Sequence, residues 1–349
     1  MNISNIIDQQ TLDALIKFGI NLLITILKIA VVLGIGLLHV AYATYFERKV
    51  IGHMQVRLGP MRVGPHGLLQ PIADGLKLFF KEDIIPDKAD KPVFYLGPVI
   101  FMASAMVNLS VIPFSSNFVI ANINVGLLFI FAIAGIGVYG IFISGWASNS
   151  KYAFIGGLRS SAQVISYEIA MGLSLVGVMI MSGSLNLTDI VRAQEESVFG
   201  MYAIPQFVAF VVFTIAAVAE TNRTPFDMPE AESELVAGYF TEYSGFRFAL
   251  FFLGEYIAMF IMASMATVCF LGGWTLPWYI KVIPFINYVP GIVWFLMKVY
   301  AFIFFYYWIR ATVPRYRYDQ LMGIGWKILI PVALANILVT GLVKILLLQ

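Results

Sequence analysis

The residues most able to do chemistry gather in one short stretch, 220–239. Five carboxylates and one arginine fall within fifteen residues there, between two long apolar runs: Glu220, Asp227, Glu230, Glu232, Glu234 and Arg223. The chain as a whole is 60% hydrophobic and only 12% charged. An acidic cluster at the mouth of a membrane span is typical of sites that handle protons or cations.

Further carboxylates lie inside apolar runs, where a charge costs about 2.5–3.5 kcal/mol at the centre of a span. Glu168 lies roughly 9 Å inside the fourth run, Glu220 ends the fifth, and Glu255 lies about a third of the way into the sixth. A structural hydrogen bond would explain Glu168, and snorkelling would explain the other two. Function explains all three together, because they lie in the same half of the membrane. Carboxylates crowded in a poorly solvated site take up and release protons near neutral pH, as a proton relay requires.

Basic residues also occur within the apolar runs or beside the acidic cluster. Lys28 and Lys298 lie inside the first and seventh runs. Lys28 is close enough to an end to snorkel, whereas Lys298 is nearer the middle and is expected to pair with another subunit. Arg223 and Arg247 flank the acidic stretch and are expected to bias it electrostatically.

The elements that must position these residues are membrane spans. Soluble proteins carry about 25% charged residues, roughly twice the fraction here, and the mean hydropathy is +0.85. A span needs about 20 mostly apolar residues. The sequence predicts an all-α integral membrane protein, a single polytopic domain over 1–349. Eight spans are predicted: 20–46, 93–114, 124–147, 162–183, 203–220, 248–273, 290–313 and 325–347.

The distribution of Lys and Arg predicts the topology. The loop 47–92 carries eight of them, and the third, fifth and seventh loops carry two each, whereas the even loops hold only Arg192 and Lys281. By the positive-inside rule the odd loops face the cytoplasm and both termini lie on the periplasmic side. Residues 1–19 lack a basic n-region, and the apolar run that follows is too long for a signal peptide, so it is expected to be the first span.

No motif for a metal, a nucleotide or a nucleic acid is present. The one cysteine, Cys269, lies in an apolar run, and His39, His53 and His66 are scattered without ligand spacing. The histidines are expected to be packing or interfacial residues.

The first loop has two parts with different expected structures. Residues 57–65 contain two Gly-Pro pairs, which exclude a continuous helix. From Pro71 onward the spacing is helical, and 66–82 is predicted to be an amphipathic helix at the membrane surface. Its apolar face holds Leu69, Ile72, Leu76, Phe79 and Phe80, and its polar face holds Gln70, Asp74, Lys77 and Lys81.

Two roles are open for this helix. It is either a plain interfacial anchor or the wall of a cavity at the membrane surface. Asp74 and Lys77 are three residues apart and are expected to pair. A plain anchor would more commonly be dominated by Lys and Arg, so the pair favours the cavity.

Ten short sequence motifs follow one another along the chain. They are ERK at 47–49, RLGP at 57–60, RVGP at 62–65, LQP at 69–71, ADGLK at 73–77, KEDIIP at 81–86, GWASNSKY at 145–152, ISYE at 165–168, the whole of 221–239, and GGW at 272–274. Each motif alone is moderately specific, and their order and spacing together are very specific. Together they resemble one family, the quinone-site membrane subunit of respiratory complex I, also called subunit 1 of NADH dehydrogenase.

The resemblance implies a subunit of a proton-translocating NADH:quinone oxidoreductase of the bacterial inner membrane that is not catalytic alone. Such a subunit lines the quinone chamber, and quinone is its substrate. Flavin and iron–sulfur centres belong to partners, which include hydrophilic-arm subunits, small membrane subunits and antiporter-like subunits. The expected proton path is Glu47, Asp74, Glu168, Glu220 and Glu255. The expected chamber residues are Arg48, Lys49, Arg62, Lys77, Asp227, Glu230, Glu232 and Glu234.

One departure from the family and two other functions stay open. The span 124–147 has no carboxylate, whereas some family members carry an acid there, and Gly135 and Gly137 mark the place to look. The first other function is a related membrane subunit of a hydrogenase-linked or other donor-linked complex. The second is a free-standing ion transporter.

Overall fold

The computed structural model describes residues 9–227, 237–277, 279 and 288–348. Within these residues every regular element is helical, apart from one isolated bridge between Ser115 and Phe118. The α-helices are α1 (Gln9–Met54), α2 (Gln70–Phe80), α3 (Lys91–Asn108), α4 (Gly126–Ala147), α5 (Lys151–Ser182), α6 (Leu187–Glu196), α7 (Phe207–Glu220), α9 (Gly245–Phe270), α11 (Gly291–Thr312), α12 (Tyr318–Ile324) and α13 (Ile330–Leu348). Two 3₁₀ turns, η2 (Pro65–Gly67) and η3 (Gly238–Phe240), and a π-helical turn, η5 (Gly325–Leu329), complete the elements.

Six helical segments are long and apolar enough to cross a membrane, which confirms a multi-pass all-helical chain. They are α1, α4, α5, α9, α11 and the continuous segment from α12 to α13. The other two predicted spans, 93–114 and 203–220, overlap α3 and α7. The helix α7 has only 14 residues, and neither helix belongs to the six. The number of spans that cross the bilayer therefore stays a prediction beyond six.

Several helices extend past the limits that hydropathy set. Helix α1 is 46 residues long, or roughly 69 Å at 1.5 Å per residue, because the charged residues after 46 continue its last turns. Helix α5 begins at Lys151, eleven residues before the predicted start, and includes two basic residues that hydropathy assigned to a loop. Hydropathy detects the apolar part of a helix, whereas backbone hydrogen bonding continues into the polar ends.

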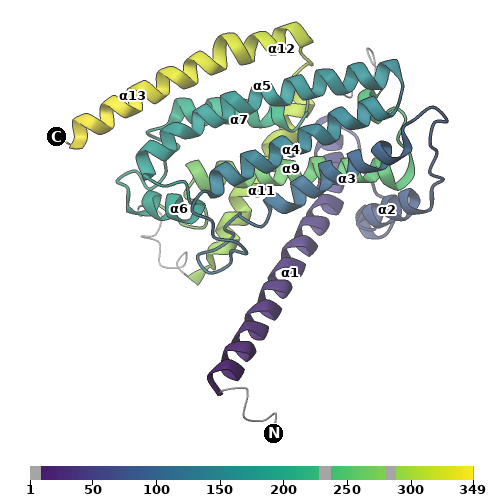
Figure 1. Ribbon diagram of the computed structural model, residues 1–349. Coiled ribbons are helices and arrows are strands. Elements are labelled where there is room, and N and C mark those ends of the chain that lie inside the picture. The colour runs from purple at the N-terminus through teal and green to yellow at the C-terminus, as the bar shows by residue number, and fades with distance from the viewer. Residues whose placement is uncertain (1–8, 228–236, 278, 280–287, 349) are drawn as a thin grey trace.

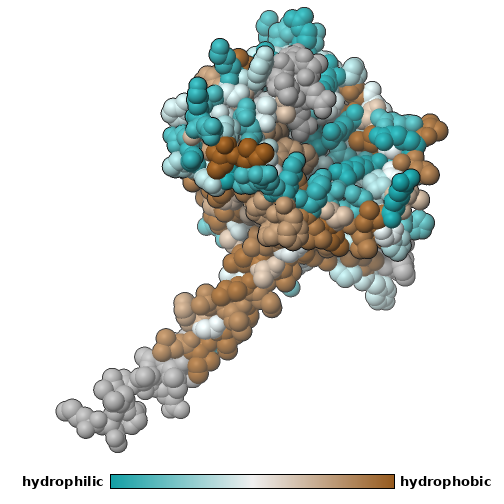
Figure 2. Space-filling model, turned by 90° about the vertical axis from the view of Figure 1, so that its right-hand side faces the viewer, coloured by the Kyte–Doolittle hydropathy of each residue, from teal (hydrophilic) through white to brown (hydrophobic). Residues whose placement is uncertain are grey.

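The amino-terminal part of α1 projects away from the rest of the molecule (Figure 1). All of residues 15–31 except Lys28 are exposed, and the first buried position among the described side chains is Val32. Figure 2 shows that this projecting part of α1 has an almost continuous apolar surface. Polar side chains gather on the rest of the molecule, at the end that carries α2. Helix α1 is therefore fixed to the rest of the chain by its carboxyl half alone.

The core of the bundle is built around α9. Its last fifteen residues, Tyr256–Phe270, are buried with the exception of Ala258. Helix α3 packs against α9 on one side and against α4 on the other, and glycines remove side chains from these contacts. A Cβ on Gly140 would lie 2.8 Å from the backbone nitrogen of Phe101. Small residues of this kind let helix backbones approach closely within membranes.

Polar side chains join the helix ends. Gln194 on α6 is fully buried and donates to the carbonyl of Val268 at 2.7 Å. It also accepts from the backbone N–H groups of Tyr202 (3.2 Å) and Gly272 (2.9 Å). Helix α6 was not predicted, although Asn186 before it caps the Thr188 N–H at 2.9 Å, as an N-cap residue does.

Lys298 corrects one expectation from the sequence. Its ammonium group donates to the carbonyls of Leu271 (2.7 Å), Gly273 (2.9 Å) and Thr275 (2.6 Å) at the carboxyl end of α9. A cation there satisfies carbonyls that the helix leaves unpaired and complements the helix dipole. These bonds use its three N–H donors inside this chain, so the expected pairing with another subunit is not needed.

We expect Gln194→Leu to destabilise the protein. Leucine keeps the volume but leaves one carbonyl and two N–H groups without the partner they have now, and each such group costs about 1–3 kcal/mol when buried. The midpoint of thermal unfolding of the detergent-solubilised protein should fall by several degrees. Thr214→Val is the control, because that hydroxyl bonds only within its own helix, to Phe210 at 2.7 Å. An unchanged midpoint for Gln194→Leu would contradict the expectation.

Candidate functional site

A cavity of about 930 Å³ lies between α1, the turn 57–60, α2, α9 and α11. Its wall is part charged and part apolar. Leu78, Phe252 and Leu253 contribute apolar surface. Four of the predicted site residues line it: Glu47, Arg48, Asp74 and Lys77. The structure therefore brings together charged residues from α1 and α2 around one space large enough for a drug-sized ligand.

Glu47 is the most buried charge on this wall, with 4% of the residue exposed. It forms ion pairs with Arg223, at 3.5 Å between Nη1 and Oε1, and with Arg310. The Tyr256 hydroxyl donates to its other oxygen at 2.5 Å. The Arg223 guanidinium also lies 4.2 Å from the centre of the Tyr256 ring. The carboxylate is thus fixed by groups from α9, α11 and the segment after α7.

Asp74 has a different partner from the one its spacing predicted. It pairs with Arg48 of α1 at 2.7 Å and accepts from Gln70 at 3.0 Å, so the expected pair with Lys77 is wrong. The side chain of Arg48 is 54% exposed, which makes this a weak, partly solvated pair. Its effect is to join α1 to α2 across the mouth of the cavity, while Lys77 stays on the wall.

Two other predicted chamber residues lie outside this cavity wall. Lys49 is directed toward Met61, with its ammonium 2.8 Å from the sulfur, and lies 5.7 Å from the centre of the Tyr45 ring. Arg62 is exposed. Both belong to the polar surface beside the cavity mouth.

The acidic stretch is only partly described. Asp227 is buried, with 3% of the residue exposed, and pairs with Arg315 at 3.2 Å. This pair fixes the start of the stretch to the segment between α11 and α12. The predicted chamber residues Glu230, Glu232 and Glu234 lie outside the described residues.

Arg247 belongs to a separate cluster at the start of α9. It pairs with Asp83 at 2.8 Å and lies 3.8 Å from the centre of the Tyr95 ring. Nearby, burial raises the pKa of Tyr243 to about 12, although hydrogen bonding to Ser144 and the Arg247 charge oppose the rise. Tyr243 therefore stays protonated and donates to the carbonyl of Phe94 at 3.2 Å. This cluster fixes the segment 81–95, and the expected influence of Arg247 on the acidic stretch stays a prediction.

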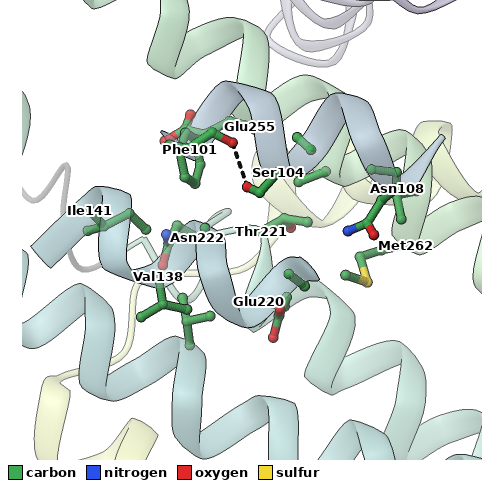
Figure 3. A pocket seen from close by; sticks show the side chains of 16 residues that line it. Phe101, Ser104, Asn108, Val138, Ile141, Glu220, Thr221, Asn222, Glu255 and Met262 are labelled. Atoms are coloured by element: carbon green, nitrogen blue, oxygen red, sulfur yellow. Dashed lines mark hydrogen bonds between the residues drawn. The ribbon is translucent and has the colours of Figure 1, made fainter. Parts of the chain in front are cut away.

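A second, smaller cavity of about 50 Å³ lies among α3, α4, α7 and α9 (Figure 3). Two predicted path residues, Glu220 and Glu255, line it. Glu255 accepts from the Tyr239 hydroxyl at 3.3 Å, whereas Oε2 of Glu220 is buried without a hydrogen-bond partner in the described chain. About 10–15 Å³ of such volume holds one water molecule, so the cavity has room for a few.

Glu168 approaches the same region from α5. The place of a Cβ on Gly135 would be 3.7 Å from one oxygen of Glu168, so this carboxylate faces α4 where α4 has no side chain. The charges of Glu168 and Glu220 are close enough to interact. Gly137, the other glycine marked from the sequence, lines the small cavity.

The two cavities share one wall. On α9, Glu255 lines the small cavity and its neighbour Tyr256 lines the large one. A change of charge at Tyr256 or Glu47 therefore acts close to the inner carboxylate, since Tyr256 directly follows it in the chain. Because the cavities hold charged and hydroxyl groups, the arrangement can bind a polar head group in the outer space and protons or cations in the inner one.

Sequence reasoning missed Arg310, Tyr256 and Asn108. Arg310 lies inside the predicted span 290–313, and a charge within an apolar run is the signal that could have identified it. Tyr256 carried no signal, because tyrosine is common in spans. Asn108, which lines the small cavity, is a lone amide within 93–114. As for metals, no group of three or more His, Cys, Asp or Glu side chains that could hold a metal ion occurs in the described ranges.

Comparison with known proteins identifies the family. A family profile described as NADH dehydrogenase matches residues 27–341. The H subunit of the NADH-quinone oxidoreductase of Rhodospirillum rubrum is 55% identical over 302 residues, which cover 86% of this chain and 88% of the relative. The corresponding H subunit of Brevibacillus brevis is 54% identical over 318 residues, which cover 91% of each chain. That of Paramagnetospirillum magneticum is 52% identical over 320 residues, which cover 92% of each chain. The chain therefore belongs to the NADH dehydrogenase family, among the membrane subunits that carry the letter H in NADH-quinone oxidoreductase.

Proposed function

We propose that this chain lines the quinone chamber of a complex I and couples quinone reduction to proton translocation. The observation that carries the proposal is the pair of cavities on either side of α9. The outer one has the volume and the mixed lining that a quinone head group and the start of its tail need. The inner one holds the carboxylates that a proton relay needs.

In the outer cavity the charged residues would stabilise the quinone during reduction. Arg48 and Lys77 supply positive charge toward a developing anion, and apolar side chains such as Phe252 and Leu253 accept the ring and tail. Reduction of a quinone to a quinol takes up two electrons and two protons. The electrons would come from partner subunits, because this sequence carries no recognisable motif for a flavin or an iron–sulfur cluster.

Coupling would begin at the Glu47 cluster. A change of charge in the outer cavity would alter the balance between Glu47, Arg223 and Arg310, which share one buried site. Tyr256 would pass that change to α9 and so to Glu255, and then to Glu220 and Glu168. Asp74 would take part at the cavity mouth through Arg48. Asp227 would anchor the start of the segment that contains Glu230, Glu232 and Glu234.

The remaining parts of the proposal concern the membrane and the partners. Helices α3 and α7 would complete eight spans, and α2 would lie at the cytoplasmic membrane surface, where its exposed Phe79 and Phe80 meet lipid. Both termini would face the periplasm of a bacterial inner membrane. Lys49 and Arg62 would contact the hydrophilic arm, and antiporter-like and small membrane subunits would complete the membrane arm.

The assignment to a complex I is tested by purifying the tagged chain from native membranes in mild detergent. We expect flavin, iron–sulfur and antiporter-like subunits to copurify, together with inhibitor-sensitive NADH:quinone activity. A nickel–iron hydrogenase module in their place would assign the chain to a different donor. Recovery of the chain alone, stable and monodisperse, would contradict the coupling function.

The outer cavity is tested by Gly75→Leu. A Cβ at Gly75 would meet nothing of the described chain within 4 Å, and a side chain there would extend into the cavity. Leucine is also a better helix former than glycine, which is about 0.8–1.0 kcal/mol less favourable than alanine, so lost folding would not explain lost activity. We expect kcat/KM for quinone to fall about tenfold or more, a loss of about 1.4 kcal/mol. NADH oxidation by a small soluble acceptor should be unchanged.

Gly341→Leu on α13 is the matched control for that variant, because this glycine also has nothing within 4 Å and lies away from the cavity. Its quinone kinetics should equal those of the parent. Equal quinone kinetics for Gly75→Leu would show that quinone does not occupy this cavity.

The proton relay is tested by Glu220→Gln and Glu168→Gln. Glutamine keeps the shape but cannot carry a proton, so we expect NADH-driven proton pumping to fall about tenfold or more. Pumping is followed in proteoliposomes with a pH-sensitive dye, alongside quinone reduction. Glu196→Gln, at an exposed position at the end of α6, is the control. Parental proton stoichiometry in both path variants would rule out the relay.

A further inference from the structure

The turn that follows α7 directs neighbouring residues to different cavities. Glu220, Thr221 and Asn222 line the inner cavity (Figure 3). Arg223, the next residue, pairs with Glu47 on the wall of the outer cavity. Asn222 has φ of +49°, a left-handed backbone conformation that residues with a side chain seldom adopt. Such a conformation persists only where the surrounding structure imposes it, and the contacts that do so here come from α5.

One amide group on α5 bonds both sides of this turn. The side-chain nitrogen of Gln163 donates to the carbonyl of Ala219 at 2.8 Å and to the carbonyl of Phe226 at 2.7 Å. These two carbonyls are seven residues apart in the chain, and Gln163 itself is fully buried. Because a carbonyl can only accept, its two partners also identify this atom as the nitrogen of the amide. Gln163 therefore ties the end of α7 to the start of the acidic stretch.

Two further residues of α5 contact the same segment. Ser160 accepts from the amide nitrogen of Asn222 at 3.2 Å. The ring of Tyr167 lies 5.8 Å from the ring of Phe226, measured between centres. Ser160, Gln163 and Tyr167 are spaced by three and four residues, so they lie on one face of α5. This face therefore contacts the segment 219–226 in its middle and at both ends.

The segment is too deep in the protein for water to replace these contacts. All residues from 216 to 227 are buried. The Phe226 ring stacks on Tyr316 at 5.7 Å between centres, and the Tyr316 backbone N–H donates to the carbonyl of Pro225 at 3.2 Å. These contacts fix the carboxyl end of the segment, and Gln163 connects that end to α7. Loss of the Gln163 donor would deprive two buried carbonyls of a hydrogen bond, so the turn would relax to recover one.

We propose that Gln163 is a positioning residue for coupling, because it holds the turn in which Glu220 lines the inner cavity while Arg223 pairs with Glu47. When this turn relaxes, Arg223 no longer stays within reach of Glu47. Quinone is still bound and reduced, since the cationic side chains of α1 and α2 keep their places, but the change of charge reaches the inner cavity less often. The inference rests on the proposed function and adds a residue that lies outside both cavity walls.

The test uses Gln163→Leu in the intact purified complex, reconstituted in proteoliposomes. Leucine keeps most of the volume and removes the donor. Proton pumping and quinone reduction are measured on the same sample, and we expect protons pumped per quinone reduced to fall at least about twofold, because two buried hydrogen bonds are lost. NADH oxidation by a small soluble acceptor should be unchanged. A general loss of structure would lower the yield of complex, or both rates together, and would leave this ratio as it was.

Gln206→Leu is the matched control. Gln206 is also a buried amide, and it donates to the Thr340 hydroxyl at 2.8 Å and accepts from Asn336 at 2.8 Å. The same substitution thus removes similar bonds at the other end of α7, and its ratio should equal that of the parent. Ser160→Ala is a second variant, in case leucine at 163 prevents assembly. It removes the acceptor for Asn222 and should lower the ratio in the same direction.

A parental ratio in assembled Gln163→Leu, or in Ser160→Ala where only that variant assembles, would overturn the proposal. An equal fall in Gln206→Leu would also overturn it. The ratio for Glu220→Gln separates this inference from the proposed function. A lower ratio for Glu220→Gln with a parental ratio for Gln163→Leu would overturn the role of Gln163 and leave the relay standing. The reverse result would support the role of Gln163 and contradict the relay through Glu220.

Discussion

Glu47 is a buried carboxylate that two guanidinium groups and one phenol stabilise, and these come from three other parts of the chain. Removing one partner of a buried pair costs about 3–5 kcal/mol, because the remaining charge has no water to solvate it. The cluster therefore fixes the positions of α1, α9, α11 and the segment after α7 relative to one another. Helix α1 depends on it most, since residues 15–31 are exposed apart from Lys28. The outer cavity is bounded by three of these elements, α1, α9 and α11, so its shape depends on the cluster.

The second constraint is the close packing of α3, α4 and α9. Glycines on α3 and α4 let these helices approach until backbone meets side chain, and α9 is buried along most of its length. Such packing leaves little room for α9 to bend gradually, because close-packed interiors transmit displacement. In the proposed function, a shift at Tyr256 would therefore be passed to Glu255, one residue away, rather than absorbed. The stiffness of the helix that separates the two cavities would then couple them.

The sequence could predict the candidate site residues better than the contacts that those residues make. Hydropathy located the apolar helices, charge within or at the end of apolar runs marked Glu168, Glu220 and Glu255, and the family resemblance marked Glu47 and Asp74. It could not predict that Asp74 would pair with Arg48, because helical spacing describes neighbours on one helix and this contact joins two. The expected partner of Lys298 was wrong for the same reason, since the carbonyls that it binds belong to the end of α9. Tyr256 and Arg310 were missed because their importance arises only from the burial of Glu47.

Helix α4 carries no carboxylate, but it leaves room for a carboxylate from a neighbouring helix. A relay needs a protonatable group within reach of its neighbours, and the helix on which that group lies does not matter. Gly135 leaves the surface of α4 open at the point that Glu168 faces, so the carboxylate of α5 occupies the space where an acid on α4 would extend. Gly137, on the same helix, lines the inner cavity and faces Ser104 of α3. In the proposed relay, a glycine at position 135 would therefore suffice on α4, because the side chain of Glu168 reaches the space that an acid on α4 would otherwise occupy.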